Sequence, residues 1–236
     1  MRNAETVLSV IRDRGDRGLP LDDVYRQLFN PNLYLKAYSR IYQNDGAMTL
    51  GVTPETADGM SIKKIENLIE EIRYERFRWT PVRRTSIPKK NGKTRPLGIY
   101  TWKDKLVQEV VRLILEAYYE PQFSDSSHGL GPKRGCHTAL TVIDRTWQGT
   151  KWFIEGDIRG CFYNINHRIL MSILREKIQD NRFLRLIESL LKAGYCEQWK
   201  YHSTLSGTPQ GAIVSPMLAN IYLDKLDKFI EQALIL

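Results

Sequence analysis

Apolar residues recur mostly at helical spacing along this chain. Positions three and four residues apart predict core-facing helices, and Asn30 before Pro31 and Ser61 further on are typical N-caps. A strongly apolar helix capped by Asp104 is expected to be largely buried. The expected helices are two short ones within 20–45, then 61–77, 104–120, a short one after 135, 166–178, one ending near 194 and a long one from 215.

Extended runs are fewer and shorter. Two of them flank Asn91-Gly92, a dipeptide favoured in hairpin turns because both residues accept positive φ. The run KWFIEGDI, 151–158, is expected to form a buried strand ending at Asp157, and a polar strand region follows at 197–204. Many helices with few strands indicate an α+β fold with a small antiparallel sheet.

Composition adds the class of protein. The 236 residues are 42% hydrophobic and 26% charged, as in ordinary globular proteins, and no run approaches the roughly 20 apolar residues of a membrane span. The N-terminus lacks the apolar core of a signal peptide, and three cysteines at unrelated spacings fit reduced thiols better than disulfides. These features predict a cytoplasmic protein, in a bacterium.

Positive charge is concentrated in one window, 73–95. The window holds nine Lys or Arg and a single acid, Glu75, so it carries the whole net charge of +8. Interleaved aromatic residues make it typical of a surface that meets polyphosphate or nucleic acid. The alternative is a solvated face that keeps the protein soluble. The cations are Arg73, Arg76, Arg78, Arg83, Arg84, Lys89, Lys90, Lys93 and Arg95, and the aromatic residues, which stack on bases or pack in the core, are Tyr74, Phe77 and Trp79.

Asp157 is the main candidate for chemistry. Functional acids often stand at the ends of apolar strands, although a turn or cap residue is the alternative. Phosphoryl-transfer polymerases hold two divalent ions about 3.5–4 Å apart and need two or more carboxylates to do so. Asp157 therefore requires partners.

Four motifs taken together resemble those of reverse transcriptases, most of all the enzymes encoded by group II introns, the intron maturases. They stand in the order and at roughly the spacing of that family, from about residue 30 onward. The resemblance implies the fingers and partial palm of a right-hand polymerase. In the family, two further catalytic aspartates lie in a Y-A-D-D hairpin beyond the last helix, so a chain ending at Leu236 is expected to be a fragment without them. The motifs are IPKKNGKTRPLGI, HGLGPKRGCHTAL, GDIRGCFYNIN and GTPQGAIVSPMLANIYL.

The resemblance also implies a division of the chain into five parts. They are an N-terminal helical extension of the fingers (1–60), fingers with the basic hairpin (61–104), a palm part with the first catalytic aspartate (105–165), a helical insertion (166–204), and the PQG motif with a truncated helix (205–236).

Roles for individual residues follow from the same resemblance. Asp157 resembles the first catalytic, metal-binding aspartate, with the Ile158 carbonyl as a further metal contact and Mg²⁺ as the cofactor, two ions in the complete enzyme. Phe162 takes the place of the bulky gate under the sugar of the incoming nucleotide, with an ordinary core aromatic as the alternative. The other nucleotide-binding candidates are Lys89 and Arg95 on the triphosphate and Gln210 and Gly211 beside base and sugar. The RNA-binding candidates are Arg73, Arg76, Arg78, Arg83, Arg84, Lys90 and Lys93.

The implied function is RNA-directed DNA polymerisation combined with intron RNA binding as a maturase. The expected partners are group II intron RNA, an RNA template with a DNA primer, and dNTP, without a membrane. We expect the fragment to bind RNA, to polymerise nothing alone, and to self-associate if apolar surfaces are left open. The alternatives are another bacterial reverse transcriptase, retron-like or diversity-generating, or a non-catalytic RNA-binding splicing module.

Overall fold

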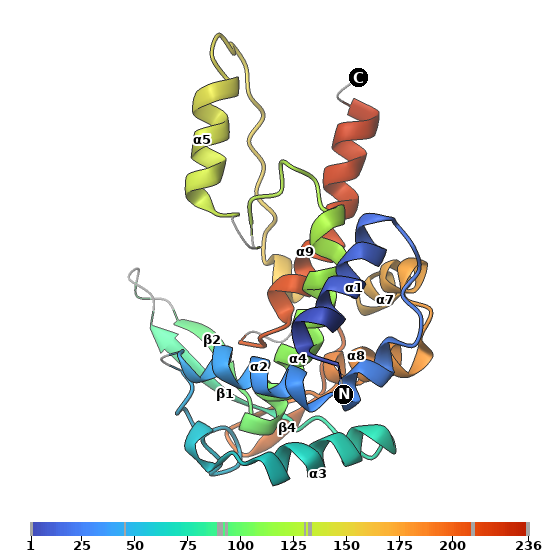
Figure 1. Cartoon of the computed structure of the whole chain (residues 1–236). Coiled ribbons are helices and arrows are strands. Elements are labelled where there is room, and N and C mark those ends of the chain that lie inside the picture. Colours follow the sequence, from blue (N-terminus) through green and yellow to red (C-terminus); the bar gives the residue numbers. More distant parts are fainter. Residues whose placement is uncertain are drawn as a thin grey trace.

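The computed structural model describes residues 2–44, 46–88, 92, 94–129, 131, 134–208 and 211–234, and helices predominate in it (Figure 1). The α-helices are α1 (Ala4–Asp16), α2 (Pro31–Tyr42), α3 (Ile62–Arg73), α4 (Trp102–Tyr119), α5 (Cys136–Thr146), α6 (Cys161–Asn164), α7 (His167–Lys177), α8 (Asn181–Leu191) and α9 (Ser215–Phe229). The strands are β1 (Val82–Pro88), β2 (Thr94–Ile99), β3 (Tyr195–Glu197) and β4 (Lys200–His202). Short 3₁₀ turns are η1 (Val24–Phe29), η2 (Ala57–Gly59) and η3 (Glu120–Gln122), and a π-helical turn, η4 (Ile230–Leu234), continues α9.

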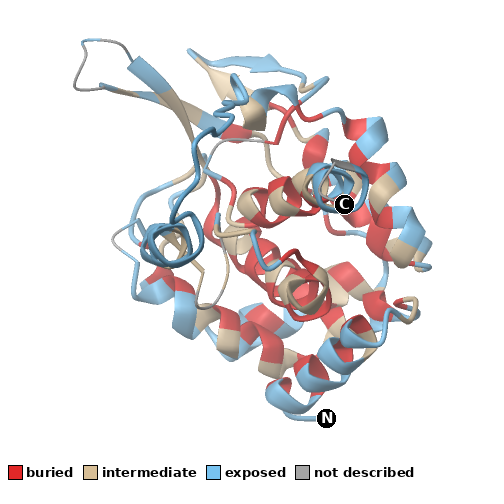
Figure 2. Cartoon of the chain, turned by 90° about the horizontal axis from the view of Figure 1, so that it is seen from above, coloured by how far each residue is buried: buried red, intermediate tan, exposed pale blue. Residues whose placement is uncertain are grey.

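Helix α4 is the axis of the core. It is apolar around most of its circumference, and α1, α2 and α9 pack against it, so its central side chains are buried (Figure 2). The burial predicted for this helix is confirmed, but its cap is not Asp104. The Thr101 hydroxyl accepts from the Asp104 amide, while the buried Asp104 carboxylate accepts from the Thr101 hydroxyl at 2.7 Å and from the Thr80 amide at 3.2 Å. The N-cap of α4 is therefore Thr101, and Asp104 is the third residue of the helix, hydrogen-bonded to that cap.

The other two predicted caps are confirmed. The Asn30 side chain accepts from the Asn32 amide and Pro31 fills the first position of α2, where a missing N–H costs nothing. The Ser61 hydroxyl accepts from the Lys64 amide at the start of α3.

The four strands form one small sheet in the order β2-β1-β3-β4. The predicted antiparallel sheet is wrong in one respect, because β1 and β3 run parallel, with Val82 opposite Tyr195. The polypeptide between them, which includes α4 to α8, returns to the sheet in the same direction, so the sheet is mixed. The antiparallel pairing of β1 with β2 and of β3 with β4 is as expected.

The hairpin of β1 and β2 is described up to Pro88 opposite Thr94. Asn91, the first residue of the predicted turn, lies outside the described residues, so the turn itself stays a prediction. Lys89, Lys90 and Lys93 lie outside the described residues, so their predicted place at the tip stays a prediction.

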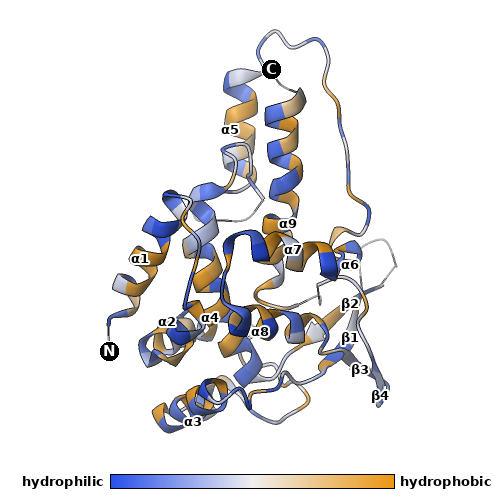
Figure 3. Cartoon of the chain, turned by 90° about the vertical axis from the view of Figure 1, so that its right-hand side faces the viewer, coloured by the Kyte–Doolittle hydropathy of each residue, from blue (hydrophilic) through white to orange (hydrophobic). Residues whose placement is uncertain are grey.

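The predicted strand at 151–158 is absent. This segment is irregular, and Trp152 and Ile154 are 89% and 100% exposed. A strand needs a hydrogen-bonded neighbour and a face to cover, and no described segment pairs with this one. Together with α5 and the end of α9 it projects from one end of the body (Figure 1), and both hydrophobic and hydrophilic residues occur along these projecting parts (Figure 3).

None of the described helices combines the length and the apolar character that crossing a membrane requires.

Candidate functional site

The loop before α9 is docked onto the turn that contains Phe162. The Thr208 amide donates to the Phe162 carbonyl at 2.7 Å, and the Gly207 amide donates to the Ile165 carbonyl at 2.8 Å. Gly207 has a φ of +81°, and a Cβ there would lie 2.7 Å from the Phe162 carbonyl oxygen. Only glycine allows this approach. The backbone ahead of the PQG motif is therefore fixed against α6.

The far end of the same loop meets strand β2. Gly211 has a φ of +91°, and a Cβ there would lie 2.2 Å from the Gly98 carbonyl oxygen and 3.2 Å from the Leu97 side chain. The Ile213 amide then donates to the Gln108 side chain of α4 at 2.8 Å. The described residues on either side of Pro209 and Gln210 therefore link α6 to the edge strand of the sheet and to α4.

Two of the predicted nucleotide-binding residues are brought to this junction by described contacts. Phe162 is partly buried against the core, and Gly211 abuts β2. Arg95 is exposed on β2, on the same face as Leu97 and two residues, about 7 Å, before it along the strand. Gln210 and Lys89 lie outside the described residues.

Asp157 stands in the irregular segment that leads to α6. Its side chain is exposed, and Ile158 beside it is half-exposed. Within the ranges that the structure describes, no group of three or more His, Cys, Asp or Glu is placed to hold a metal ion. Mg²⁺ is bound through several oxygen ligands, and catalytic pairs of ions need more than one carboxylate. The residues described here therefore do not by themselves fit the expected two-metal site.

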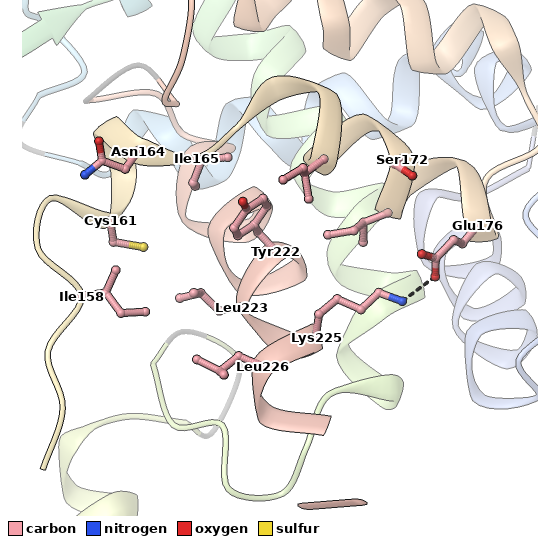
Figure 4. Close-up of a pocket in the computed structure, with 12 residues that line it drawn as sticks. Ile158, Cys161, Asn164, Ile165, Ser172, Glu176, Tyr222, Leu223, Lys225 and Leu226 are labelled. Carbon is pink, nitrogen blue, oxygen red and sulfur yellow. Dashed lines mark hydrogen bonds and ion pairs between the residues drawn. The ribbon is translucent and has the colours of Figure 1, made fainter. Parts of the chain in front are cut away.

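An apolar pocket of about 600 Å³ lies next to Asp157, between α7 and α9 (Figure 4). Ile158 and Cys161 border it on one side, and Tyr222 and Leu226 of α9 on another. An ion pair between Lys225 and Glu176 crosses one end. The lining is mostly apolar, with Asn164, Ser172, Glu176 and Lys225 as its polar members, and none of the predicted nucleotide-binding residues that the structure describes lines it.

The arginines of the basic window are divided between different surfaces. Neighbouring residues of a strand point to opposite faces, so Arg83 shares a face with Arg95 while Arg84 does not. Arg83 donates to the Leu50 carbonyl, and Arg84 lies 3.6 Å from Glu197. Arg73 pairs with Glu70 on α3.

Arg76 and Arg78 are the more available cations of the window. Neither forms an ion pair within the described part of the chain; Arg76 lies over the Tyr74 ring, and Arg78 donates to backbone carbonyls. Glu75, the one acid of the window, is held by Arg185 and Arg182 of α8 at 2.7 and 3.0 Å. The hydrogen bond from Arg185 is the main reason that the pKa of Glu75 is lowered. This acid is thus neutralised by cations from outside the window.

The aromatic residues of the window divide the same way. Phe77 and Trp79 are buried, edge to face at 4.8 Å, and the Trp79 indole donates to the Leu186 carbonyl. Phe77 and Trp79 therefore pack in the core, which was the alternative to base stacking. Tyr74 is 62% exposed and remains a candidate for stacking.

Three residues that position the site were not predicted from the sequence. Gly207 is the first glycine of the GTPQG motif, and a second glycine four residues before Gly211 is the sequence feature that could have indicated it. Gln108 is a fully buried polar residue within an apolar helix, a combination that calls for a specific partner. His167, also buried, is hydrogen-bonded through its Nε2 to the Gly207 carbonyl at 2.7 Å, and no local signal pointed to this contact.

Comparison with protein families gives one match, which covers most of the chain. Residues 87–236 match the family described as reverse transcriptase (RNA-dependent DNA polymerase).

Individual relatives are similar over nearly the whole chain. The group II intron-encoded protein LtrA of Lactococcus lactis subsp. cremoris is 53% identical over 210 residues, 89% of this chain and 35% of LtrA. An uncharacterized 91 kDa protein in the cob intron of Schizosaccharomyces pombe is 50% identical over 204 residues, 86% of this chain and 25% of that protein. The chain thus spans about a third or less of the length of these relatives.

A solved structure, a partial Cas6-RT-Cas1–Cas2 complex, has the same fold. The match covers 88% of this chain and 35% of the chain in that structure, with a TM-score of 0.58 and 19% sequence identity.

Proposed function

Since this chain belongs to the reverse transcriptase (RNA-dependent DNA polymerase) family, we propose that it forms the nucleotide-binding part of an RNA-directed DNA polymerase encoded by a group II intron. The observation that supports this most is the junction of α6, the PQG loop and β2. Two glycines with left-handed backbone bring Phe162, Gly211 and the strand that bears Arg95 into one neighbourhood.

Within this junction we assign the following roles. The Phe162 ring lies under the sugar of the incoming deoxynucleotide and leaves no room for a 2′-hydroxyl. Arg95, with Lys89, binds the triphosphate, since a guanidinium offers a fork and an ammonium a point charge. Gln210 and Gly211 lie against base and sugar, where glycine permits close approach.

Asp157, with the Ile158 carbonyl, would contribute ligands to the divalent metal that the family's chemistry requires, two Mg²⁺ ions in the complete enzyme. Such ions stabilise the charge on the transferred phosphate and activate the attacking oxygen. Because the described residues form no group of three or more His, Cys, Asp or Glu that could hold a metal ion, we expect the 236-residue chain alone to extend no primer.

The five-part division of the chain belongs to the same proposal. Residues 1–60 extend the fingers, 61–104 form the fingers, 105–165 and 205–236 contribute to the palm, and 166–204 form a helical insertion.

Phe162→Ala in the full-length protein tests the nucleotide site. We expect the ratio of kcat/KM for dNTP over rNTP to fall by about 100-fold, the selectivity that one hydroxyl group typically supplies. The ratio is a sound readout because it does not depend on how much of the enzyme is folded. An unchanged ratio would remove Phe162 from the sugar pocket, and Phe229→Ala, at an exposed phenylalanine of α9, is the control.

A second function is favoured by Arg76, Arg78 and Tyr74. These exposed groups, free of acidic partners in the described chain, suit the binding of group II intron RNA as a maturase. The RNA template with its DNA primer is the other nucleic acid that the proposed polymerase takes. The two functions are compatible on one chain.

A further inference from the structure

A second groove lies on the opposite face of the sheet from Arg83 and Arg95. It has a volume of about 330 Å³, and its walls come from β1, β2, β3 and the loop 203–208. Arg84 and Gly98 face each other across β1 and β2, which places them on the side that Arg83 and Arg95 do not occupy. None of the nucleotide-site roles proposed above uses this groove.

Aromatic rings and a guanidinium form its most distinctive wall. The Arg84 guanidinium lies 4.4 Å over the Tyr195 ring, and Tyr195 stacks on His202 at 5.0 Å with 16° between the planes. Tyr163 and Leu205 form the rim and are 43% and 88% exposed. Planar rings and a planar cation are the surfaces on which nucleic-acid bases stack.

Hydroxyl groups supply the polar part of the lining. Ser203, Thr204 and Ser206 line the wall, and none of the described lining residues is an acid; Glu197, outside the lining, lies 3.6 Å from Arg84. Thr208, at 3% exposure, closes the floor, and its hydroxyl has no hydrogen-bond partner among the described residues. Such groups suit the edge of a base or a ribose 2′-hydroxyl, which distinguishes RNA from DNA.

The hairpin that carries this wall ends in a further exposed ring. Gln198 and Trp199 form its turn with φ of +49° and +64°, a conformation that a bulky side chain rarely adopts. Trp199 is fully exposed there. A two-residue turn between paired strands requires positive φ at both residues, and this turn therefore presents a large ring to solvent.

We propose that this groove binds an unpaired nucleotide of RNA, with its base against the Arg84 guanidinium, which Tyr195 and His202 support from behind. Its volume is at the small end of the roughly 300–1,000 Å³ of ligand pockets, which suits one nucleotide and excludes a duplex. The inference rests on the proposed RNA binding, but the groove adjoins the nucleotide site through Gly207 and Thr208 and uses neither the residues assigned to the nucleotide nor Arg76 and Arg78. A cationic protein with aromatic and hydroxyl groups in one groove favours RNA over a peptide.

Fluorescence anisotropy with two labelled RNAs of equal length tests the proposal, one an unstructured single strand and the other a blunt duplex. Arg84→Gln and Leu205→Glu should weaken binding of the single strand by about tenfold and leave the duplex within about twofold, the loss expected for one stacked base. Leu205 is so exposed that its variant has no reason to misfold. Arg83→Gln is the matched control: it removes the same charge from the other face and should weaken both RNAs equally.

The outcomes separate this inference from the proposed function. If the wild type binds neither RNA, RNA binding and the groove's role both fail. If it binds both RNAs but Arg84→Gln behaves like Arg83→Gln, or Leu205→Glu affects both RNAs alike, the groove is not an RNA site and a peptide becomes the better occupant.

Discussion

The Asp104 carboxylate is buried at the start of α4, where it accepts from Thr101 and Thr80 and leaves one oxygen without a partner among the described residues. Burial raises the pKa of Asp104 to about 6, against these hydrogen bonds, which act to lower it. The group is thus a structural acid that titrates in a mildly acidic range.

Asp104→Asn should change the pH dependence of stability. The folded protein holds this proton more tightly than the unfolded chain, so the stabilisation is complete below the ordinary pKa of 3.8 and is lost as the pH rises through about 6. Asparagine does not ionise, so across this window the unfolding free energy of the variant should gain about 3 kcal/mol relative to wild type. Urea denaturation at several pH values measures this, and parallel curves for the two proteins would contradict the assignment.

Among the secondary-structure elements, the sequence predicted those features that depend on residues close together in the chain. Asn30 and Ser61 cap their helices as expected because a cap and its amide lie within three residues of each other. The parallel pairing of Val82 with Tyr195 joins segments more than a hundred residues apart, and the docking of Gly207 on Phe162 depends on a turn that the sequence does not display. Those features could not be read from periodicity.

The strand predicted at 151–158 is absent although its local signal is good. Its apolar run is a good strand signal, yet a strand is defined by a partner, and the described chain offers none. Of the site, the sequence thus indicated Asp157, Phe162 and Gly211 through motifs, while the supports Gln108 and His167 emerged only from the fold.

Exposed apolar side chains on this segment predict self-association. Trp152, Phe153 and Ile154 are exposed near one end of the molecule, and the apolar pocket between α7 and α9 is open. We expect the weight-average mass in sedimentation equilibrium to rise with protein concentration, and Ile154→Asp to lower it at a given concentration. Ile62→Asp, at an exposed residue of α3, is the control. A monomer at every concentration would dispose of the idea.

For the whole molecule, charge determines how RNA is bound. The net charge of +8 resides in the window 73–95, but the fold distributes its arginines over both faces of the sheet and the end of α3. A nucleic acid that touches several of these surfaces releases counterions at each contact. The chain should therefore bind RNA with a strong salt dependence.

Titration of intron RNA at several salt concentrations measures that dependence. We expect log affinity to fall linearly with log salt, and Arg76→Gln and Arg78→Gln each to reduce the slope by about 0.7–0.9, the value for one phosphate contact. Arg175→Gln, at an exposed arginine outside the window, should leave the slope unchanged. A flat salt response of the wild type would count against the RNA-binding function.

Primer extension on an RNA template by the polypeptide as encoded in full, with and without Asp157→Ala, tests the central claim most directly. Asp157 is exposed, so its removal should not disturb folding, and RNA affinity within about twofold of wild type would confirm this. We predict that the variant loses extension by at least about a thousandfold, because metal-dependent phosphoryl transfer fails without a ligand of the ions. An Asp157→Ala protein that binds RNA and still extends primers at the wild-type rate would contradict the catalytic role of this residue.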